Sequence, residues 1–368
     1  MKVILAAVAL LLLVACAQFS STTTAVDLST LKLNEIQFIG SHNSYKKAID
    51  PPLLAQLAAN NQVLAMSLDY AHLPLFEQLD LGLRKLELDV FYDPKGELYD
   101  TPLGLKMTDN ASSYTQQPMR QPGFKVLHVQ DVDFRSHCQR FTQCLQQLRS
   151  WSLQNEGHLP IVVTVNAKDQ KIPRAGFTRP LKFDTQAWLL LDSEIRLTLE
   201  DKLYTPDDFR GGENTLAAAV KRGWPSLNAM RSKVLVVLDH EGEKLASYIK
   251  DHPALMGRAM FVNAKEGSAE AAIRIVNNPI DKYDYIQSLV KSGYIVRTRA
   301  DADTVEARNG STNRRDKAFS SGAQIISTDY YVEDPRFSSG YQVSLPAGAV
   351  AICNRLLVAH HCTFMGRN

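Results

Sequence analysis

Short apolar runs recur along the chain and are separated by segments with helical periodicity. Eight such runs lie at 36–40, 85–90, 125–129, 161–165, 234–238, 259–262, 294–297 and 324–327. Most are rich in Val, Ile or Leu, as expected of strands that are covered on both faces. Helical patterns fill most gaps, for example at 139–152, 185–200, 241–250, 282–291 and 303–319. Alternation of strand and helix predicts a parallel sheet, and eight units predict a closed barrel.

The predicted fold is therefore an α/β protein with a single, distorted (β/α)8 barrel of the TIM type. A length of 368 residues suits one such barrel with insertions. The gaps at 46–80, 93–123 and 170–233 are longer than a minimal barrel needs, and loops of this length are usually functional or disordered. We expect long loops at the C-terminal mouth of the barrel. No internal repeat divides the chain, so residues 31–368 are predicted to form one domain.

The N-terminal residues have the pattern of an export signal. An apolar run at 3–14 follows a basic start and is too short for a permanent membrane span, which predicts a signal peptide over 1–17. The four residues that end at Cys16 resemble the bacterial lipobox, in which the cysteine is lipidated, although ordinary cleavage between small residues also fits. Residues 18–30 suit a flexible tether. We expect an exported protein, either secreted or periplasmic, or lipid-anchored at Cys16.

The four remaining cysteines form two pairs that are local in sequence. Cys138 and Cys144 close one short loop, and Cys353 and Cys362 close another. An even number of cysteines behind an export signal predicts two disulfides, with buried free thiols as the alternative. No CxxC spacing supports a zinc site.

The charge balance is close to neutral, with a formal net charge of +2. No block of Lys and Arg stands out, so the sequence does not predict nucleic-acid binding. It predicts no protein partner either.

Polar residues follow most of the apolar runs. In a barrel of this type the C-terminal ends of the strands meet at one mouth, where the active site lies. These strand-end residues are His42 with Asn43, Glu87 with Asp89, His128, Asn166 with Lys168, Asp239 with His240, Asn263, Arg297 with Arg299, and Thr328 with Asp329 and Tyr330.

Asn43, Glu87 and Asp89 form an oxygen-only set that suits calcium or magnesium. Only two of the three are charged, so water or substrate oxygens would complete the shell, as in a catalytic metal site. The alternative is that the two carboxylates pair with Arg84 or Lys85. Because neighbours in a strand point to opposite faces, we expect those basic residues to lie away from the carboxylates.

His42 and His128 are the histidines with the most informative setting. Histidine titrates near neutral pH, so a pair that flanks a phosphate can share acid and base roles. A lone histidine at a strand end is usually structural, but here a carboxylate pair lies on the intervening strand.

Three segments in this order resemble the catalytic X region of phosphoinositide-specific phospholipases C. They are Gly40-Ser41-His42-Asn43-Ser44-Tyr45, Leu86-Glu87-Leu88-Asp89-Val90 and Val126-Leu127-His128. The similarity is to the secreted or surface calcium-dependent phosphatidylinositol phospholipases C of bacteria and fungi. It runs from about residue 37 to residue 330 and includes 122–138 and 322–330.

The resemblance implies cleavage of phosphatidylinositol to diacylglycerol and a cyclic inositol phosphate, by attack of the inositol 2-hydroxyl on phosphorus. It implies Ca²⁺ as the cofactor, with Asn43, Glu87 and Asp89 as ligands. His128 would protonate the departing oxygen. His42 would stabilise the phosphoryl charge or act as the base, and Glu87 is the other candidate base.

One position departs from the eukaryotic members of the family. They have a Glu where this chain has Asn166, which can ligate a metal through its amide oxygen but cannot accept a proton. Asp131 or Asp133 could compensate for the missing carboxylate.

The expected partner is a phosphatidylinositol-type phospholipid at a membrane surface. Lys168, Arg297 and Arg299 are candidate contacts for phosphate or inositol, and Tyr330 is a candidate stacking residue. Membrane contact is expected from loops such as 46–80.

Three alternatives stay open on the sequence alone. A glycerophosphodiester phosphodiesterase shares the barrel and the metal pair, but its first strand usually ends in His-Arg-Gly. A metal-independent phosphatidylinositol phospholipase would have an Arg at the metal position. A non-catalytic surface barrel that binds phospholipid or sugar is the third.

Overall fold

The computed structural model describes residues 30–108 and 114–365. The predicted signal peptide over 1–17, its Cys16 and the tether up to residue 29 lie outside the described residues. Over the described part of the chain, no helix is long and apolar enough to cross a membrane.

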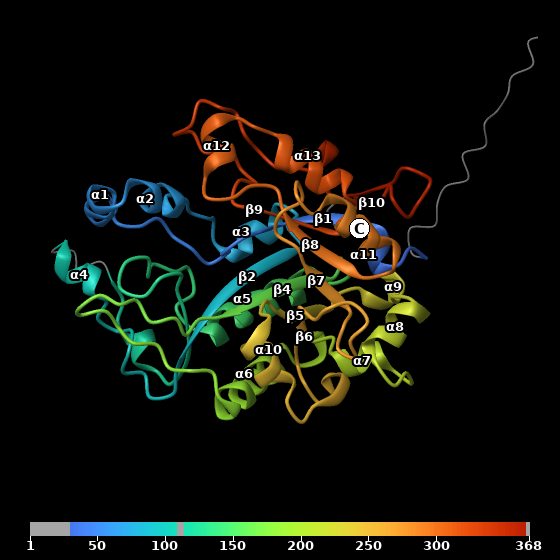
Figure 1. The fold of residues 1–368 in the computed structure, drawn as a ribbon, viewed down its shortest axis with the longest axis horizontal. Coiled ribbons are helices and arrows are strands. Elements are labelled where there is room, and N and C mark those ends of the chain that lie inside the picture. Colours follow the sequence, from blue (N-terminus) through green and yellow to red (C-terminus); the bar gives the residue numbers. More distant parts are fainter. Residues whose placement is uncertain (1–29, 109–113, 366–368) are drawn as a thin grey trace, which may run out of the picture.

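Eight parallel strands form the barrel in the order β6-β5-β4-β2-β1-β9-β8-β7, and a parallel bridge between Asn263 and Ile273 joins β6 to β7. The predicted barrel is therefore confirmed, and Figure 1 shows its strands at the centre of the molecule with the helices around them. The strands are β1 (Ile36–Ser41), β2 (Lys85–Asp93), β4 (Ile161–Ala167), β5 (Val234–Leu238), β6 (Phe261–Val262), β7 (Ile273–Ile275), β8 (Ile295–Arg299) and β9 (Ile325–Thr328).

The five predicted helical segments are present, as α5, α6, α10, α11 and the pair α12 and α13, and the three gaps predicted as long loops contain further helices. They are α1 (Pro51–Asn60), α2 (Gln62–Leu68), α3 (Leu75–Asp80), α4 (Leu103–Met107), α5 (Phe141–Gln154), α6 (Thr185–Leu199), α7 (Pro206–Arg210), α8 (Leu216–Arg222), α9 (Leu227–Met230), α10 (Gly242–Ile249), α11 (Tyr283–Lys291), α12 (Val305–Asn309) and α13 (Asn313–Ser320). The predicted helix at 303–319 is divided in two because Gly310 ends α12 with a left-handed φ of 74°.

The prediction for 125–129 was wrong. β3 (Gly123–Val126) is not a barrel strand but pairs antiparallel with the outer end of β2, where Val90 faces Val126 and Asp93 faces Gly123. β2 is nine residues long and extends past the barrel wall, which leaves its outer end free to pair. The eighth barrel strand is β7, whose three residues are too few to show a sequence period.

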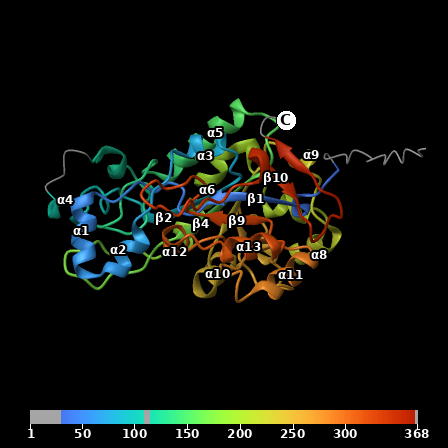
Figure 2. The same cartoon turned by 90° about the horizontal axis from the view of Figure 1, so that it is seen from above.

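Two of the long loops pack together on a small core of their own. It includes Leu53 of α1, Leu68 of α2, Leu105 of α4 and Phe134, all buried. Figures 1 and 2 both show α1, α2 and α4 grouped at one side of the barrel. This subdomain forms one wall of the mouth, because it follows the C-terminal ends of β1 and β2.

Both predicted disulfides are present. Cys138 is bonded to Cys144, and Cys353 is bonded to Cys362. The second joins β10 (Ala349–Cys353) to the segment that leads into β11 (Thr363–Met365), and β10 pairs antiparallel with the start of β1. Two disulfides in short loops fit a protein that folds in an oxidising compartment.

Gly40 is the closest point of contact between β1 and β2. A Cβ at Gly40 would lie 2.7 Å from the carbonyl carbon of Lys85, and closer still to the carbonyl oxygen and Cβ of that residue. The absence of a side chain therefore allows β1 to pair with β2 beside Lys85.

We predict that Gly40→Ala lowers the free energy of unfolding by about 3 kcal/mol, or prevents folding, because the added methyl overlaps backbone that cannot move. Denaturant titration would measure the effect. The control is Gly212→Ala, at a position where a Cβ meets no atom within 4 Å among the described residues. Equal stability of the two variants would contradict the close contact.

Candidate active site

Lys85, Glu87 and Asp89 all point into the barrel from β2. They are two residues apart in a strand and therefore share one face. All three are buried. The expectation that the basic residues lie away from the carboxylates was therefore wrong for Lys85: only odd-numbered separations reverse the face, and Lys85 is two residues from Glu87.

The carboxylate of Glu87 is held by a compact set of donors. Its Oε2 accepts hydrogen bonds from Lys85 Nζ at 2.5 Å, Arg297 Nη2 at 2.8 Å and Thr164 Oγ1 at 3.1 Å. Burial alone would raise the pKa of Glu87, but the charges of Lys85 and Arg297 outweigh it and hold that pKa well below its usual value. Glu87 is therefore ionised, with Oε1 as its free oxygen.

His42 lies between two carboxylates at the end of β1. Its Nδ1 is 3.0 Å from Asp329 Oδ1, and its Nε2 is 3.7 Å from Glu87 Oε1. Arg299 Nη2 bonds the other oxygen of Asp329 at 3.2 Å. Burial and the nearby charge of Arg299 lower the pKa of His42, so the neutral imidazole predominates at pH 7.

His128 has a carboxylate partner of its own. Its Nδ1 is 2.8 Å from Asp133 Oδ2, and Lys46 Nζ is 3.3 Å from the same oxygen. The tight turn that follows β3 creates this contact, since the backbone N–H groups of His128 and Val129 both donate to the carbonyl of Asp133. Asp133 therefore orients the imidazole through Oδ2, while its Oδ1 is buried without a hydrogen-bond partner among the described residues.

Tyr70 links the two histidines. Its ring centroid is 6.1 Å from that of His42 and 6.4 Å from that of His128, so both predicted histidines flank one side chain. Asn43 Nδ2 donates to Tyr70 Oη at 2.7 Å, which leaves the amide oxygen of Asn43 available as a ligand. Asn43 has a φ of 48°, a left-handed conformation that Asn adopts more readily than most residues.

The predicted metal ligands are neighbours in the structure. Asp89 is opposite Asn166 in the pairing of β2 with β4, and the backbone N–H of Ser44, next to Asn43, donates to the carbonyl of Glu87 at 3.0 Å. Over the described residues, Asp89 Oδ1 is buried without a hydrogen-bond partner. The hydroxyl of Tyr45 lies next to this carboxylate, and burial together with the charge of Asp89 raises the pKa of Tyr45. A buried carboxylate oxygen that accepts no hydrogen bond fits a cation ligand, so the donor set is compatible with calcium.

Cations already contact both carboxylates of the predicted set. Lys168 Nζ is 3.2 Å from Asp89 Oδ2, and Lys85 and Arg297 share the inner oxygen of Glu87. Over the described chain, no three His, Cys, Asp or Glu side chains converge as metal ligands. The predicted set contains only two such side chains, and its other oxygens are amides.

The predicted substrate-binding residues have different settings. Lys168 and Arg299 are partly exposed beside Asp89 and Asp329. Arg297 is buried beneath Glu87. Tyr330 is only 2% exposed, and its ring packs against Phe337 and Tyr341.

Sequence reasoning did not find several residues of the site. Tyr70 and Lys46 lie in the long loop after β1, where no period marks them. His72 was set aside, yet its Nε2 is 3.6 Å from Asp329 Oδ1. Asp239, which the sequence placed among the strand-end residues of the mouth, lies beside Glu87, and burial raises its pKa to about 6. Tyr70, Lys46 and His72 carry no sequence signal of that kind.

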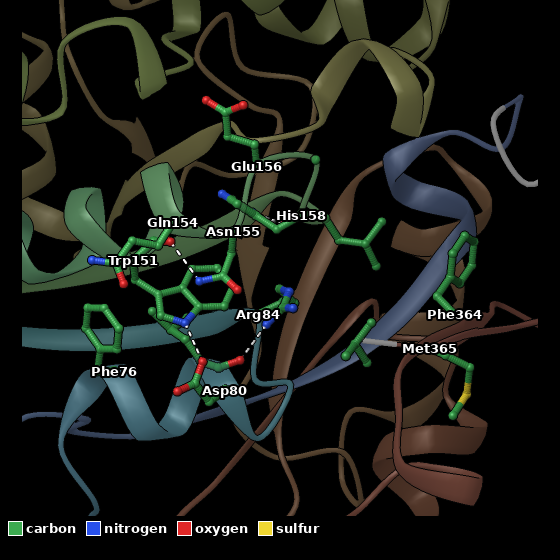
Figure 3. A pocket seen from close by; sticks show the side chains of 14 residues that line it. Phe76, Asp80, Arg84, Trp151, Gln154, Asn155, Glu156, His158, Phe364 and Met365 are labelled. Atoms are coloured by element: carbon green, nitrogen blue, oxygen red, sulfur yellow. Dashed lines mark hydrogen bonds between the residues drawn. The ribbon is translucent and has the colours of Figure 1, made fainter. Parts of the chain in front are cut away.

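A separate pocket lies at the opposite end of the barrel (Figure 3). It has a volume of about 590 Å³ and is lined by Arg84, Trp151 and His158, among others. Trp151 Nε1 donates to Asp80 Oδ1 at 2.8 Å across its floor. Arg84 and His158 precede β2 and β4, so this pocket is at the N-terminal ends of the strands and has no part in the site.

Comparisons with known proteins identify a matching family and proteins of similar fold. Residues 31–355 match the family described as "Phosphoinositide phospholipase C, Ca2+-dependent". A calcium-dependent phosphoinositol-specific phospholipase C from a Gram-negative Pseudomonas species has a TM-score of 0.54 and 18% identity, over 86% of this chain and 95% of that one.

A Ca²⁺-dependent phosphatidylinositol-specific phospholipase C from Streptomyces antibioticus has a TM-score of 0.51 and 18% identity, over 82% of this chain and 95% of that one. At such identities the solved structures support the fold alone. Among curated proteins, none matches.

Asp301 supports the site from behind Asp329. Its Oδ1 accepts a hydrogen bond from the backbone N–H of Asp329 at 2.8 Å, and its Oδ2 accepts one from Thr328 Oγ1. Burial, followed by the charge of Asp329, raises the pKa of Asp301 from 3.8 to about 7. Between those two pH values the native state binds more protons at this group than the unfolded state does. The contribution of Asp301 to stability is therefore lost as pH rises.

We predict that the wild type loses about 1–3 kcal/mol more unfolding free energy between pH 5 and pH 8 than Asp301→Asn does, because Asn has no proton to lose. Urea titrations at the two pH values would measure the difference. A pH dependence that survives unchanged in the variant would refute the assignment.

Proposed function

Because the chain belongs to the calcium-dependent phosphoinositide phospholipase C family, we propose that it cleaves phosphatidylinositol to diacylglycerol and a cyclic inositol phosphate. Members of this family are phosphoric diester hydrolases, so the chain is an enzyme of that class. Membership favours this activity over that of a glycerophosphodiester phosphodiesterase and over a binding role without catalysis. The observation that carries the proposal is the pair of His–Asp contacts, both on Nδ1, that flank Tyr70, with Glu87 beside His42.

Calcium is the proposed cofactor, held by Asn43, Glu87, Asp89 and Asn166. When bound, it would make a coordinated hydroxyl more acidic and offset negative charge on the phosphate. Glu87 would contribute Oε1, because Oε2 is occupied by donors, and Asp89 would contribute the unpartnered Oδ1.

His42 is proposed as the base that accepts the proton of the inositol 2-hydroxyl. Asp329 fixes the Nδ1–H, which leaves the lone pair on Nε2. A hydroxyl that donates to His42 Nε2 would also lie near Glu87 Oε1, which is 3.7 Å from that nitrogen, so Glu87 remains the alternative base. The lowered pKa of His42 keeps this acceptor unprotonated at neutral pH.

His128 is proposed as the acid. Asp133 binds its Nδ1, so Nε2 presents the proton to the departing glycerol oxygen. The oxygen of the 2-hydroxyl then bonds to phosphorus as the bond from phosphorus to the glycerol oxygen breaks. One proton passes to His42 and one leaves His128, and exchange with water restores both.

The cations around the mouth suit a phosphate and an inositol ring. Lys168 and Arg299 are partly exposed and are the proposed contacts for the head group. Arg297 is proposed to act through Glu87, which it contacts directly. Tyr330 is packed away from solvent, so we assign it a packing role rather than stacking on substrate.

An exposed apolar patch at the mouth is the proposed contact with the membrane. It comprises Val63, Leu64 and Met66 of α2 with Val305 of α12, all exposed. Thr304 Oγ1 donates to the carbonyl of Met66 at 2.9 Å, so the two helices lie together there. The patch follows the C-terminal ends of the strands, where a lipid head group must enter. An export signal would place the enzyme where such a surface can meet membranes.

We predict that His128→Ala lowers kcat on phosphatidylinositol vesicles by at least about 100-fold, because the leaving oxygen loses its proton donor. Vesicle binding should change little. Asp133→Asn should lower kcat by a smaller factor than His128→Ala does, because the imidazole is still present. His360→Ala, at an exposed histidine, is the matched control. An equal loss of binding and turnover in His128→Ala would contradict the role of acid.

We predict that Val63→Asp lowers the rate of vesicle hydrolysis by at least about tenfold. Moving a charged side chain from water into the apolar part of the membrane costs free energy. Hydrolysis of a monomeric short-chain phosphatidylinositol should be unchanged. Leu197→Asp is a matched control, since Leu197 on α6 is 75% exposed and Val63 is 78% exposed. Equal effects of the two variants on vesicles would argue against the patch.

A further inference from the structure

Lys85 is a fixed positive charge within the proposed calcium site. We propose that Lys85 is a built-in counter-cation that limits Glu87 to one metal-ligating oxygen and sets the calcium affinity of this enzyme below that of its oxygen ligands alone. The inference rests on the proposed function, because it takes calcium as the bound ion.

The ammonium group of Lys85 is held on three sides. Its Nζ donates to Glu87 Oε2 at 2.5 Å, to the carbonyl of Ser41 at 2.9 Å and to Ser327 Oγ at 3.2 Å. The side chain is fully buried. These contacts come from β2, β1 and β9, so an incoming ion cannot displace the ammonium group without breaking contacts to three strands.

Gly40 makes this position possible. A Cβ at Gly40 would overlap the Cβ and backbone of residue 85, so glycine lets β1 lie close to β2 at the position of Lys85. The lysine then crosses under β1 to reach the carbonyl of Ser41.

Arg297 reinforces the effect from the opposite wall. Its Nη2 donates to the same oxygen of Glu87 at 2.8 Å and to Ser327 Oγ at 3.1 Å. Two cations therefore share Oε2, and only Oε1, on the side of His42, can face an ion. A bidentate Glu87 would require both contacts to break.

The energetic consequence follows from Coulomb's law. Two positive groups close to a divalent ion oppose its binding, and screening is weak in a buried site. The same groups compensate the buried charge of Glu87 before any ion arrives. The barrel is thereby stabilised without metal, at the expense of affinity.

The first test is isothermal titration of the full chain with Ca²⁺, without substrate. Lys85→Met should bind calcium at least about tenfold more tightly than the wild type, because a fixed positive charge is gone. Lys125→Met is the matched control, since Lys125 is equally buried and its Nζ is 3.5 Å from Asp93 Oδ2 at the outer end of β2. That variant should bind within about twofold of the wild type. Unchanged or weaker binding by a folded Lys85→Met would overturn the proposal.

A crystal structure of the wild type with Ca²⁺ tests the geometry, and it decides the question if Lys85→Met does not fold. The proposal expects Glu87 to bind through Oε1 alone, with Oε2 still hydrogen-bonded to Lys85. A bidentate Glu87 with Lys85 displaced would overturn it. If the wild type binds no calcium at this site, the cofactor assignment itself fails, together with this inference. Calcium binding that is insensitive to Lys85 defeats the inference alone.

Discussion

The ion cluster around the buried carboxylate of Glu87 is the contact on which the rest of the site depends. A buried charge costs several kcal/mol unless it is paired and hydrogen-bonded, and here Lys85 and Arg297 supply the pairing. Lys85 also donates to β1 and β9, Arg297 comes from β8 and Thr164 from β4, so the cluster links five strands beneath the mouth. That arrangement places His42 at the free oxygen of Glu87.

The two histidines of the site come from different structural elements. His42 ends a barrel strand, and its carboxylate partner Asp329 follows the last barrel strand. His128 lies in a tight turn after an outer strand, and its partner Asp133 is five residues away. Tyr70 lies between the two imidazoles. Each carboxylate fixes one ring nitrogen and leaves the other for chemistry, which suits one base and one acid.

Sequence patterns predicted the parts of the fold that depend on local order. Buried parallel strands give apolar runs, so the barrel was recognised, but β7 is too short to show a period. The order and spacing of the motifs predicted that His42 and His128 belong to one site. The pairing of His42 with Asp329 spans 287 residues and depends on barrel closure. The contact between Lys85 and Glu87 could have been predicted from the sequence, because residues two apart in a strand point to the same face.

The proposed reaction is a calcium-dependent attack of an inositol hydroxyl on phosphorus, which produces a cyclic phosphate. Phosphorus NMR of the purified protein with phosphatidylinositol, first with calcium and then with excess chelator, is the decisive experiment for this reaction. We expect a cyclic inositol phosphate signal that requires calcium. Formation of that product in the presence of chelator would contradict the metal assignment. An acyclic product that appears without a cyclic precursor would contradict the mechanism.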